Sequence, residues 1–200
     1  NTHLHILEAY TALYRIMPTA EVRLALRSLI LLFLEKFIDP ETNHLRLFFD
    51  EKWQLKSDEI SFGHDIECSW LLCEAAEILQ GDNLLYDVRK KAVAIAGRTL
   101  AEGIDRDGGV YNTADAFGLT NRDKDWWPQA EAVVGFLNAW QITRKDCFLQ
   151  TALNSWHFIQ EYLLDIKNGE WFWAWNADGT PDIINDKAGP WKCPYHNGRT

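Results

Sequence analysis

The chain reads His64-Asp65-Ile66-Glu67 near the start of a predicted helix, and this motif has two counterparts, His5-Ile6-Leu7-Glu8 and Pro128-Gln129-Ala130-Glu131. The glutamates of successive copies are 59 and 64 residues apart. Self-similarity with a period of roughly this length is typical of repeat proteins, in which each repeat is one supersecondary unit that packs against the next. We therefore interpret the chain as a series of related helical hairpins.

Apolar residues recur at helical spacing in six segments that form three pairs. Thr19 is the expected N-cap of the second segment, and the Asp39-Pro40 step ends it. The predicted helices cover residues 4–16, 19–37, 64–79, 84–104, 128–142 and 147–164. Each pair is followed by a turn-rich, strand-like segment, at residues 43–57, 105–112 and 169–182, in which Asp107-Gly108-Gly109 and Asp178-Gly179 are hairpin signals.

The first helix of each pair carries polar residues at its N-terminal end. In a closed ring of helical hairpins these ends meet around one cavity, whereas an open solenoid gives them no shared site. The pattern therefore favours an all-α fold, a closed α/α barrel with short β-hairpins between helix pairs. Because the chain begins and stops within polar, aromatic clusters, we expect residues 1–200 to be one partial catalytic domain that is truncated at both ends.

The composition argues against several classes of partner and site. The formal net charge of −9 argues against nucleic acid, since binding its phosphates requires a basic surface. The longest apolar run, Leu29 to Leu34, is too short to span a bilayer, so we expect no membrane contact. The four cysteines are scattered with no CxxC pair, which argues against a zinc site and favours a reducing, cytoplasmic location.

Histidines provide the candidate catalytic groups. In a His-x-x-Glu segment of a helix the two side chains lie on nearly the same face, so the carboxylate can orient an imidazole, and imidazole titrates near neutral pH. His5 and His64 begin helices of this kind, and His196 lies at the start of a fourth, incomplete repeat. We expect these three histidines to share one end of the barrel. His44 and His157 are interpreted as structural.

The same groups are also potential metal ligands. Three histidines and two glutamates resemble the ligands of di-iron bundles, but those sites need more carboxylates around one centre, and the HExxH motif is absent. We therefore expect neither a metal nor another cofactor. Ten tryptophans in 200 residues fit either a packed core or a carbohydrate as the small-molecule ligand, because the C–H face of a sugar ring packs on an aromatic face.

Four ordered segments carry a family resemblance: Asn1 to Tyr10, Phe62 to Trp70, Trp126 to Ala132 and Lys192 to Asn197. They resemble the signature segments of the cellobiose 2-epimerases, which belong to the N-acylglucosamine 2-epimerase superfamily. The resemblance implies an (α/α)6 barrel of which this chain is roughly the second half. It also implies an isomerase that inverts C2 of the reducing-end glucose of a β-1,4-linked disaccharide. Such an enzyme converts cellobiose to glucosyl-mannose, and also acts on lactose, through a ring-opened substrate and a cis-enediolate.

The resemblance also implies roles for residues of this chain. His64 and His196 would exchange the C2 proton on opposite faces of the intermediate, and His5 would contact sugar oxygens or assist ring opening. The substrate-binding residues that it implies are Asn1, Glu67, Trp70, Trp127, Glu131 and Trp191. The family also uses an arginine from its N-terminal half to stabilise the enediolate, and no residue of this chain is assigned that role. We therefore expect the chain alone to be inactive, and its oligomeric state is left open.

Three alternatives remain at the level of sequence. An N-acylglucosamine 2-epimerase or a mannose aldose–ketose isomerase of the same superfamily would share nearly all of the proton chemistry. A glycoside hydrolase on an α/α barrel would need a pair of carboxylates, for which Glu67, Glu131 and Asp65 are candidates. A non-catalytic carbohydrate-binding module would need the aromatic residues but not the histidines.

Overall fold

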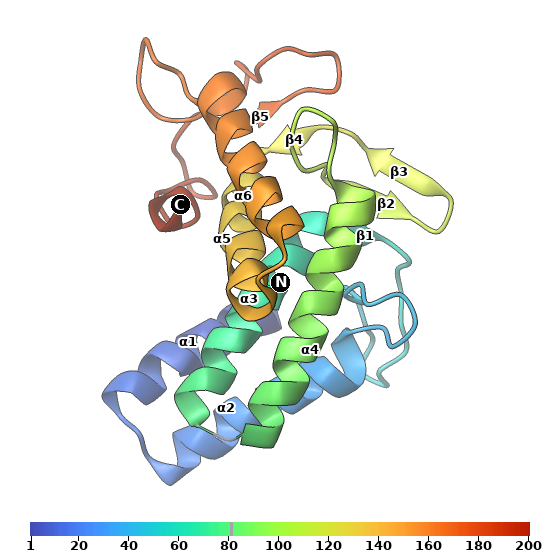
Figure 1. Ribbon diagram of the computed structural model, residues 1–200, viewed down its shortest axis with the longest axis vertical. Coiled ribbons are helices and arrows are strands. Elements are labelled where there is room, and N and C mark those ends of the chain that lie inside the picture. The colour runs from blue at the N-terminus through green and yellow to red at the C-terminus, as the bar shows by residue number, and fades with distance from the viewer. Residues whose placement is uncertain (81) are drawn as a thin grey trace.

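The computed structural model describes residues 1–80 and 82–200. Within these residues the chain forms six α-helices, which are labelled in Figure 1: α1 (Thr2–Ile16), α2 (Ala20–Leu32), α3 (Phe62–Leu79), α4 (Asp82–Arg98), α5 (Trp126–Thr143) and α6 (Asp146–Phe158). The prediction of six helices in three pairs is confirmed, and the helix starts differ from the predicted ones by one or two residues. Thr19 is the N-cap of α2, where its side chain accepts a hydrogen bond from Val22 N.

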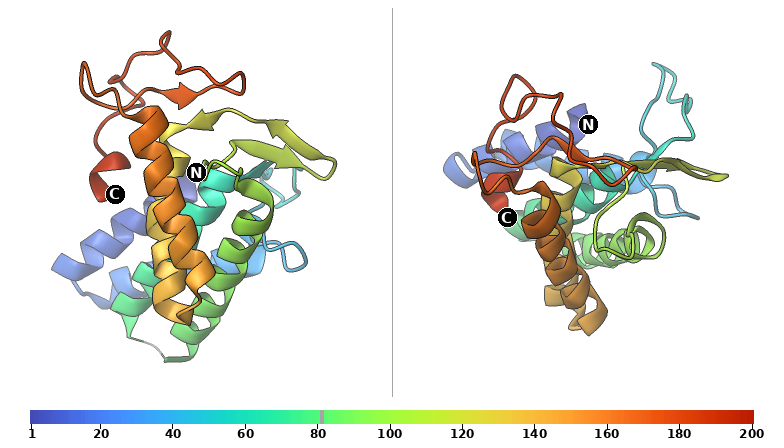
Figure 2. Two further views of the ribbon diagram at one scale, coloured as in Figure 1. Left: turned by 45° about the horizontal axis from the view of Figure 1, so that its top comes forward. Right: turned by 90° about the horizontal axis from the view of Figure 1, so that it is seen from above.

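The helices form three hairpins, α1–α2, α3–α4 and α5–α6, and α3 packs between α1 and α5. Most of the residues of α3, and half of those of α5, are buried, as expected of the inner helices of a layered helical fold. The helices α1, α3 and α5 begin at the end of the molecule where the strands and the C-terminal segment lie (Figure 2). Among the described residues, none of the helices combines the length and the hydropathy that a membrane span requires.

Each outer helix continues into one turn of π-helix. These turns are Phe33–Phe37, Thr99–Gly103 and Ile159–Leu163, and they account for the helix ends predicted at residues 37, 104 and 164. Two residues after each turn stands an aspartate whose carboxylate accepts hydrogen bonds from the backbone N–H groups that follow; these residues are Asp39, Asp105 and Asp165. The same local structure thus occurs three times, as the repeat interpretation requires.

The strands are short. Strand β2 (Thr113–Asp115) pairs with β1 (Ile60–Ser61) on one side and with β3 (Gly118–Asn121) on the other, and all of these pairings are antiparallel. Strand β4 (Lys124–Asp125) pairs with β5 (Ala174–Trp175). Because β1 directly precedes α3 and β4 directly precedes α5, the two sheets fix where these inner helices begin.

The strands differ from the prediction in three places, one of which is residues 105–112, where a turn closed by the isolated bridge between Ile104 and Val110 replaces a strand. Residues 43–57 contain isolated bridges, such as that between Phe49 and Leu55, in place of a continuous strand. Asn43 and Trp53 have φ values of +62° and +61°, which interrupt an extended backbone. The hairpin of β2 and β3 is additional to the predicted ones, and Gly118 enables it with a φ of +132° that favours glycine.

Side chains of α3 and α5 form hydrogen bonds with the loop segments that precede these helices, at residues 45 and 110. Asp65 Oδ1 accepts a hydrogen bond from Leu45 N at 2.7 Å, and Gln129 Oε1 accepts one from Val110 N at 2.6 Å. Asp65 and Gln129 occupy the same position in their copies of the motif, directly after its first residue. This position is therefore structural in both repeats, and the first and fourth positions are left to form a site.

Candidate active site

The N-terminal ends of α1, α3 and α5 and the segment of residues 191–196 surround a cavity of about 580 Å³, a volume that suits a small molecule. Seven of the nine predicted site residues line it: Asn1, His5, His64, Glu67, Trp127, Trp191 and His196. Of the other two, Glu131 is buried, and Trp70 lines a separate cavity of about 420 Å³. The structure therefore brings the three predicted catalytic histidines to one cavity.

His64 is held in the first turn of α3. Its Nδ1 lies 2.7 Å from Ser61 Oγ, and its ring centroid lies 4.8 Å from that of Trp127. Burial lowers the pKa of His64 to about 3, and the charges of the amino group of Asn1, of His5 and of His196 act in the same direction. His64 is therefore neutral at physiological pH, which is the form in which an imidazole accepts a proton.

His196 is held by a buried carboxylate. Its Nδ1 lies 2.7 Å from Glu131 Oε1, and Trp70 donates its Nε1–H to Glu131 Oε2, also at 2.7 Å. A carboxylate in this position fixes the orientation of the imidazole ring, while Nε2 is left for chemistry. The centroid of the Trp127 ring lies 5.6 Å from that of His196, so one indole borders both this histidine and His64.

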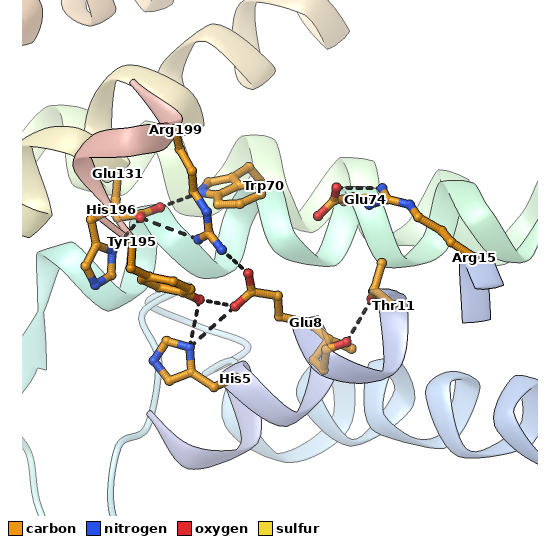
Figure 3. Close-up of polar contacts among 11 residues, drawn as sticks. His5, Glu8, Thr11, Arg15, Trp70, Glu74, Glu131, Tyr195, His196 and Arg199 are labelled. Atoms are coloured by element: carbon orange, nitrogen blue, oxygen red, sulfur yellow. Dashed lines mark hydrogen bonds and ion pairs between the residues drawn. The ribbon is translucent and has the colours of Figure 1, made fainter. Parts of the chain in front are cut away.

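His5 belongs to a second hydrogen-bonded group, which Figure 3 shows. Its Nδ1 lies 3.1 Å from Tyr195 Oη and 3.6 Å from Glu8 Oε2. Tyr195 donates its hydroxyl proton to Glu8 Oε2, and Arg199 donates to the other oxygen of the same carboxylate. The sequence patterns do not single out Tyr195 or Arg199, although both lie within a few residues of His196.

Glu67 is a buried carboxylate, and within the described chain its Oε1 has no hydrogen-bond partner. Burial and the charge of Glu131 raise the pKa of Glu67 well above its usual value, so it can hold a proton and donate a hydrogen bond to a hydroxyl group. Glu67, Glu131 and His196 have side-chain atoms within 4.8 Å of one another, which is close enough to share a metal ion. Both oxygens of Glu131 already accept hydrogen bonds from His196 and Trp70, so a metal would have to displace them.

His44, which we interpreted as structural, lies in a separate buried group. Its Nδ1 lies 2.6 Å from Asp65 Oδ2, and its Nε2 lies 3.0 Å from Glu102 Oε2. These contacts join the segment that follows α2 to α3 and to the π turn after α4, which supports the structural interpretation. His157 lies on the outer helix α6.

The chain is similar over nearly its whole length to one family of proteins. The model of the family described as N-acylglucosamine 2-epimerase (GlcNAc 2-epimerase) matches residues 1–198. The chain belongs to the N-acylglucosamine 2-epimerase family. Over all 200 residues it is 47% identical to a cellobiose 2-epimerase from Bacteroides fragilis and 41% identical to one from Dictyoglomus turgidum. It covers 51% of each, so the chain spans about half the length of these curated relatives.

The solved structure of a cellobiose 2-epimerase shares the fold. The chain superimposes on a cellobiose 2-epimerase from Bacillus thermoamylovorans with a TM-score of 0.93 and 37% identity, covering 99% of this chain and 50% of that one. The fold prediction is thereby confirmed. The chain forms about half of an (α/α)6 barrel, and its cellobiose 2-epimerase relatives are enzymes of the isomerase class.

Proposed function

We propose that the full-length protein containing this chain inverts C2 of the reducing-end glucose of a β-1,4-linked disaccharide. The observation that carries this proposal is that His64 and His196 line one cavity and border one indole ring, that of Trp127. Inversion requires a proton to leave one face of C2 and another to arrive on the opposite face, which calls for two separate proton-transfer groups. The two relatives that are 47% and 41% identical to the chain are both cellobiose 2-epimerases, which supports a β-1,4-linked disaccharide as the substrate.

The proposed reaction begins with the open-chain sugar. One imidazole takes the proton from C2, the C2–H electron pair forms the C1–C2 double bond, and the π electrons of the aldehyde move onto O1 to give a cis-enediolate. The second imidazole, in its protonated form, gives a proton to the opposite face of C2, and the aldehyde re-forms. One imidazole has gained a proton and the other has lost one, so the pair is ready for the reverse reaction.

The surroundings of the two rings suit opposite starting states. Burial lowers the pKa of His64 well below its usual value, so this ring starts neutral and can accept a proton. His196 bonds through Nδ1 to the carboxylate of Glu131, the kind of partner that orients an imidazole acting as a general acid. We therefore infer that His64 begins as the base and His196 as the acid in one direction, and that they exchange roles in the other.

The remaining groups would bind and open the sugar. Trp191 is 85% exposed and lines the cavity together with Trp127, so the two indoles can pack on the two rings of a disaccharide. We infer that Glu67 bonds to a sugar hydroxyl through its unpartnered oxygen and that Asn1 contacts the substrate at the cavity wall. His5, with its hydroxyl partner, would assist ring opening.

A glycoside hydrolase fits the described residues less well. Asp65 is buried and bonds to His44 and to the backbone of residue 45, and both oxygens of Glu131 accept hydrogen bonds. Glu131 lies within 4.8 Å of Glu67, but because His196 and Trp70 engage both of its oxygens it is poorly suited to be the second carboxylate of the pair that glycoside hydrolysis needs. An N-acylglucosamine 2-epimerase or a mannose isomerase would use the same histidines, but a monosaccharide would cover only one of the two indoles.

The test is to incubate the full-length protein in deuterated water with cellobiose, mannose or N-acetylmannosamine. We expect cellobiose to give glucosyl-mannose with solvent deuterium at C2. His64→Ala and His196→Ala should each lower kcat by at least about 100-fold while the circular dichroism spectrum stays unchanged. His157→Ala, on the outer helix α6, is the matched control and should keep wild-type activity.

Several outcomes would contradict the proposal. Fructose from mannose without any epimer of cellobiose would indicate an isomerase, and glucose from cellobiose would indicate a hydrolase. Complete retention of the original C2 hydrogen would exclude proton exchange with the solvent. Loss of activity on dialysis against EDTA, with recovery on adding a divalent cation, would indicate a metal site at Glu67, Glu131 and His196.

A further inference from the structure

Arg199 lies between the glutamates of two copies of the repeated motif. Its Nη2 donates a hydrogen bond to Glu8 Oε1, and its Nη1 lies 3.9 Å from Glu131 Oε1. The side chains of Arg199 and Glu8 are partly buried, and that of Glu131 is 1% exposed. Removing charges from water is costly unless they are paired, so one cation here offsets two carboxylates.

Each of the two glutamates contacts a different histidine of the cavity. Glu131 Oε1 lies 2.7 Å from His196 Nδ1. Glu8 accepts the hydroxyl proton of Tyr195, and the Tyr195 oxygen lies 3.1 Å from His5 Nδ1. A continuous chain of polar contacts therefore runs through the following side chains, as Figure 3 shows: His196, Glu131, Arg199, Glu8, Tyr195 and His5.

Aromatic rings hold the guanidinium group in place. The Cζ atom of Arg199 lies 4.0 Å from the ring centroid of Tyr195 and 5.2 Å from that of Trp70. Trp70 also donates its N–H to Glu131, so the ring that supports the cation orients the carboxylate beside it. Arg199 lines the cavity of about 420 Å³. It is not among the residues that line the cavity of about 580 Å³, which contains the three histidines. Arg199 can thus act on the reaction through the glutamates without touching the sugar.

We propose that Arg199 is a positioning residue that couples His196 to His5 by fixing the carboxylates of Glu131 and Glu8. The proposal rests on the epimerase function proposed above. With the guanidinium in place, both carboxylates are partly neutralised: Glu8 accepts a hydrogen bond from Nη2, whereas Nη1 lies 3.9 Å from Glu131 Oε1 and acts on it by its charge. Without it, two anions would remain beside the imidazoles and would favour their protonated forms up to a higher pH.

The charge of Arg199 already acts on one of these histidines. Burial lowers the pKa of His5, and the positive charge of Arg199 acts in the same direction. Replacing the arginine with a neutral side chain should therefore raise the pKa of His5. This shift is a direct readout of the coupling and does not depend on turnover.

The experiment compares Arg199→Gln and Arg199→Lys with Arg15→Gln in the full-length protein. Arg15 is the matched control because it lines the same cavity but pairs with Glu74, at 2.6 Å, outside the chain of contacts. We expect Arg199→Gln to lower kcat for cellobiose at least about tenfold while KM changes less than about threefold. The acid limb of its pH profile should move to higher pH, and a histidine NMR titration should show a raised pKa for His5.

The lysine variant separates charge from geometry. Lysine keeps the positive charge but lacks the planar group that reaches two carboxylates. We therefore expect Arg199→Lys to return the acid limb to its wild-type pH while recovering only part of kcat. Arg15→Gln should match the wild type in kcat, in KM and in the pH profile.

A purely structural role would lower the melting temperature of Arg199→Gln but leave the acid limb and the pKa of His5 unchanged, and that result would overturn the proposal. Should Arg199→Gln fail to fold, wild-type kcat in Arg199→Lys would overturn it. A wild-type protein that epimerises no sugar would instead contradict the proposed function. The NMR titration would still test the coupling of Arg199 to His5 in that case.

Discussion

Trp127 lies so close to Gly63 that a Cβ atom at position 63 would come within 2.4 Å of the indole Cη2. The same Cβ would lie 2.9 Å from Cγ of Pro128, and both distances are too short for non-bonded carbon atoms. The indole in turn borders the imidazoles of His64 and His196, at centroid distances of 4.8 and 5.6 Å. Glycine at position 63 therefore lets α5 approach α3 closely enough for one indole to reach both histidines.

Gly63→Ala should therefore lower kcat/KM for cellobiose at least about tenfold, because the added methyl group displaces the Trp127 ring and a small misplacement at a reacting site is costly. The matched control is Gly97→Ala on α4, where a Cβ meets nothing within 4 Å. Gly97→Ala should keep wild-type activity and gain up to about 1 kcal/mol of stability. Steady-state kinetics and thermal unfolding check both variants, and wild-type kcat/KM in Gly63→Ala would contradict the role given to Trp127.

Trp70 should affect turnover more than substrate binding. Its Nε1–H is donated to Glu131 Oε2 at 2.7 Å, and its ring lines the cavity away from the histidines. Trp70→Phe keeps an aromatic ring but removes this donor, which should lower kcat by about tenfold and leave KM nearly unchanged. Trp191→Ala, which alters the wall of the histidine cavity, should mainly raise KM. A raised KM with unchanged kcat in Trp70→Phe would instead support the sugar-packing role that the family resemblance implies.

The helices could be predicted because each one carries its own periodic apolar pattern and end signals. Thr19 at the start of α2 is an example in which a local cap decides the boundary. The π turns and the β2–β3 hairpin could not be predicted from such patterns. A π turn changes the hydrogen bonding without a distinct apolar spacing, and the hairpin depends on the positive φ of Gly118.

The residues of the cavity could be predicted because the repeated motif places them at equivalent positions of the inner helices. Contacts between the ends of the chain could not, since Arg199 and Glu8 are 191 positions apart and no local pattern connects them. The sequence did contain one signal of the contact between Arg199 and the glutamates. Glutamates that recur at the starts of buried helices need a cation nearby, and Arg199 stands three residues after His196.

The buried group around His44 should make stability depend on pH. Burial alone would lower the pKa of His44, but hydrogen bonds and charges from Asp65 and Glu102 outweigh it and raise the pKa. Since the folded pKa exceeds the unfolded value of about 6.5, this stabilisation is fully present below the unfolded value and is lost as the pH rises through the folded one. His44→Gln should therefore lower the melting temperature more at pH 6 than at pH 9, by about 2–4 °C for each kcal/mol lost.

His157→Gln is the matched control for this pH dependence, because it replaces a histidine on the outer helix α6. Its effect on the melting temperature should be the same at pH 6 and at pH 9. Differential scanning calorimetry of the three proteins at both pH values measures these changes. An effect of His44→Gln that is equal at the two pH values would mean that His44 contributes by packing and not by its charge.

Cysteine labelling should report whether the disaccharide occupies the proposed cavity. Cys193 is exposed and lines this cavity, whereas Cys147 is exposed on the outer helix α6. Cys68 and Cys73 are buried, and burial raises the pKa of Cys73 to about 11, so these thiols should stay protonated and unreactive. Iodoacetamide at pH 8 should therefore label Cys147 and Cys193, which peptide mass spectrometry can quantify.

Saturating cellobiose should slow the labelling of Cys193 and leave that of Cys147 unchanged, because a bound sugar covers only the thiol of Cys193. An unchanged rate at Cys193 would mean that the sugar binds elsewhere, since the cavity that this thiol lines also contains both proposed catalytic imidazoles.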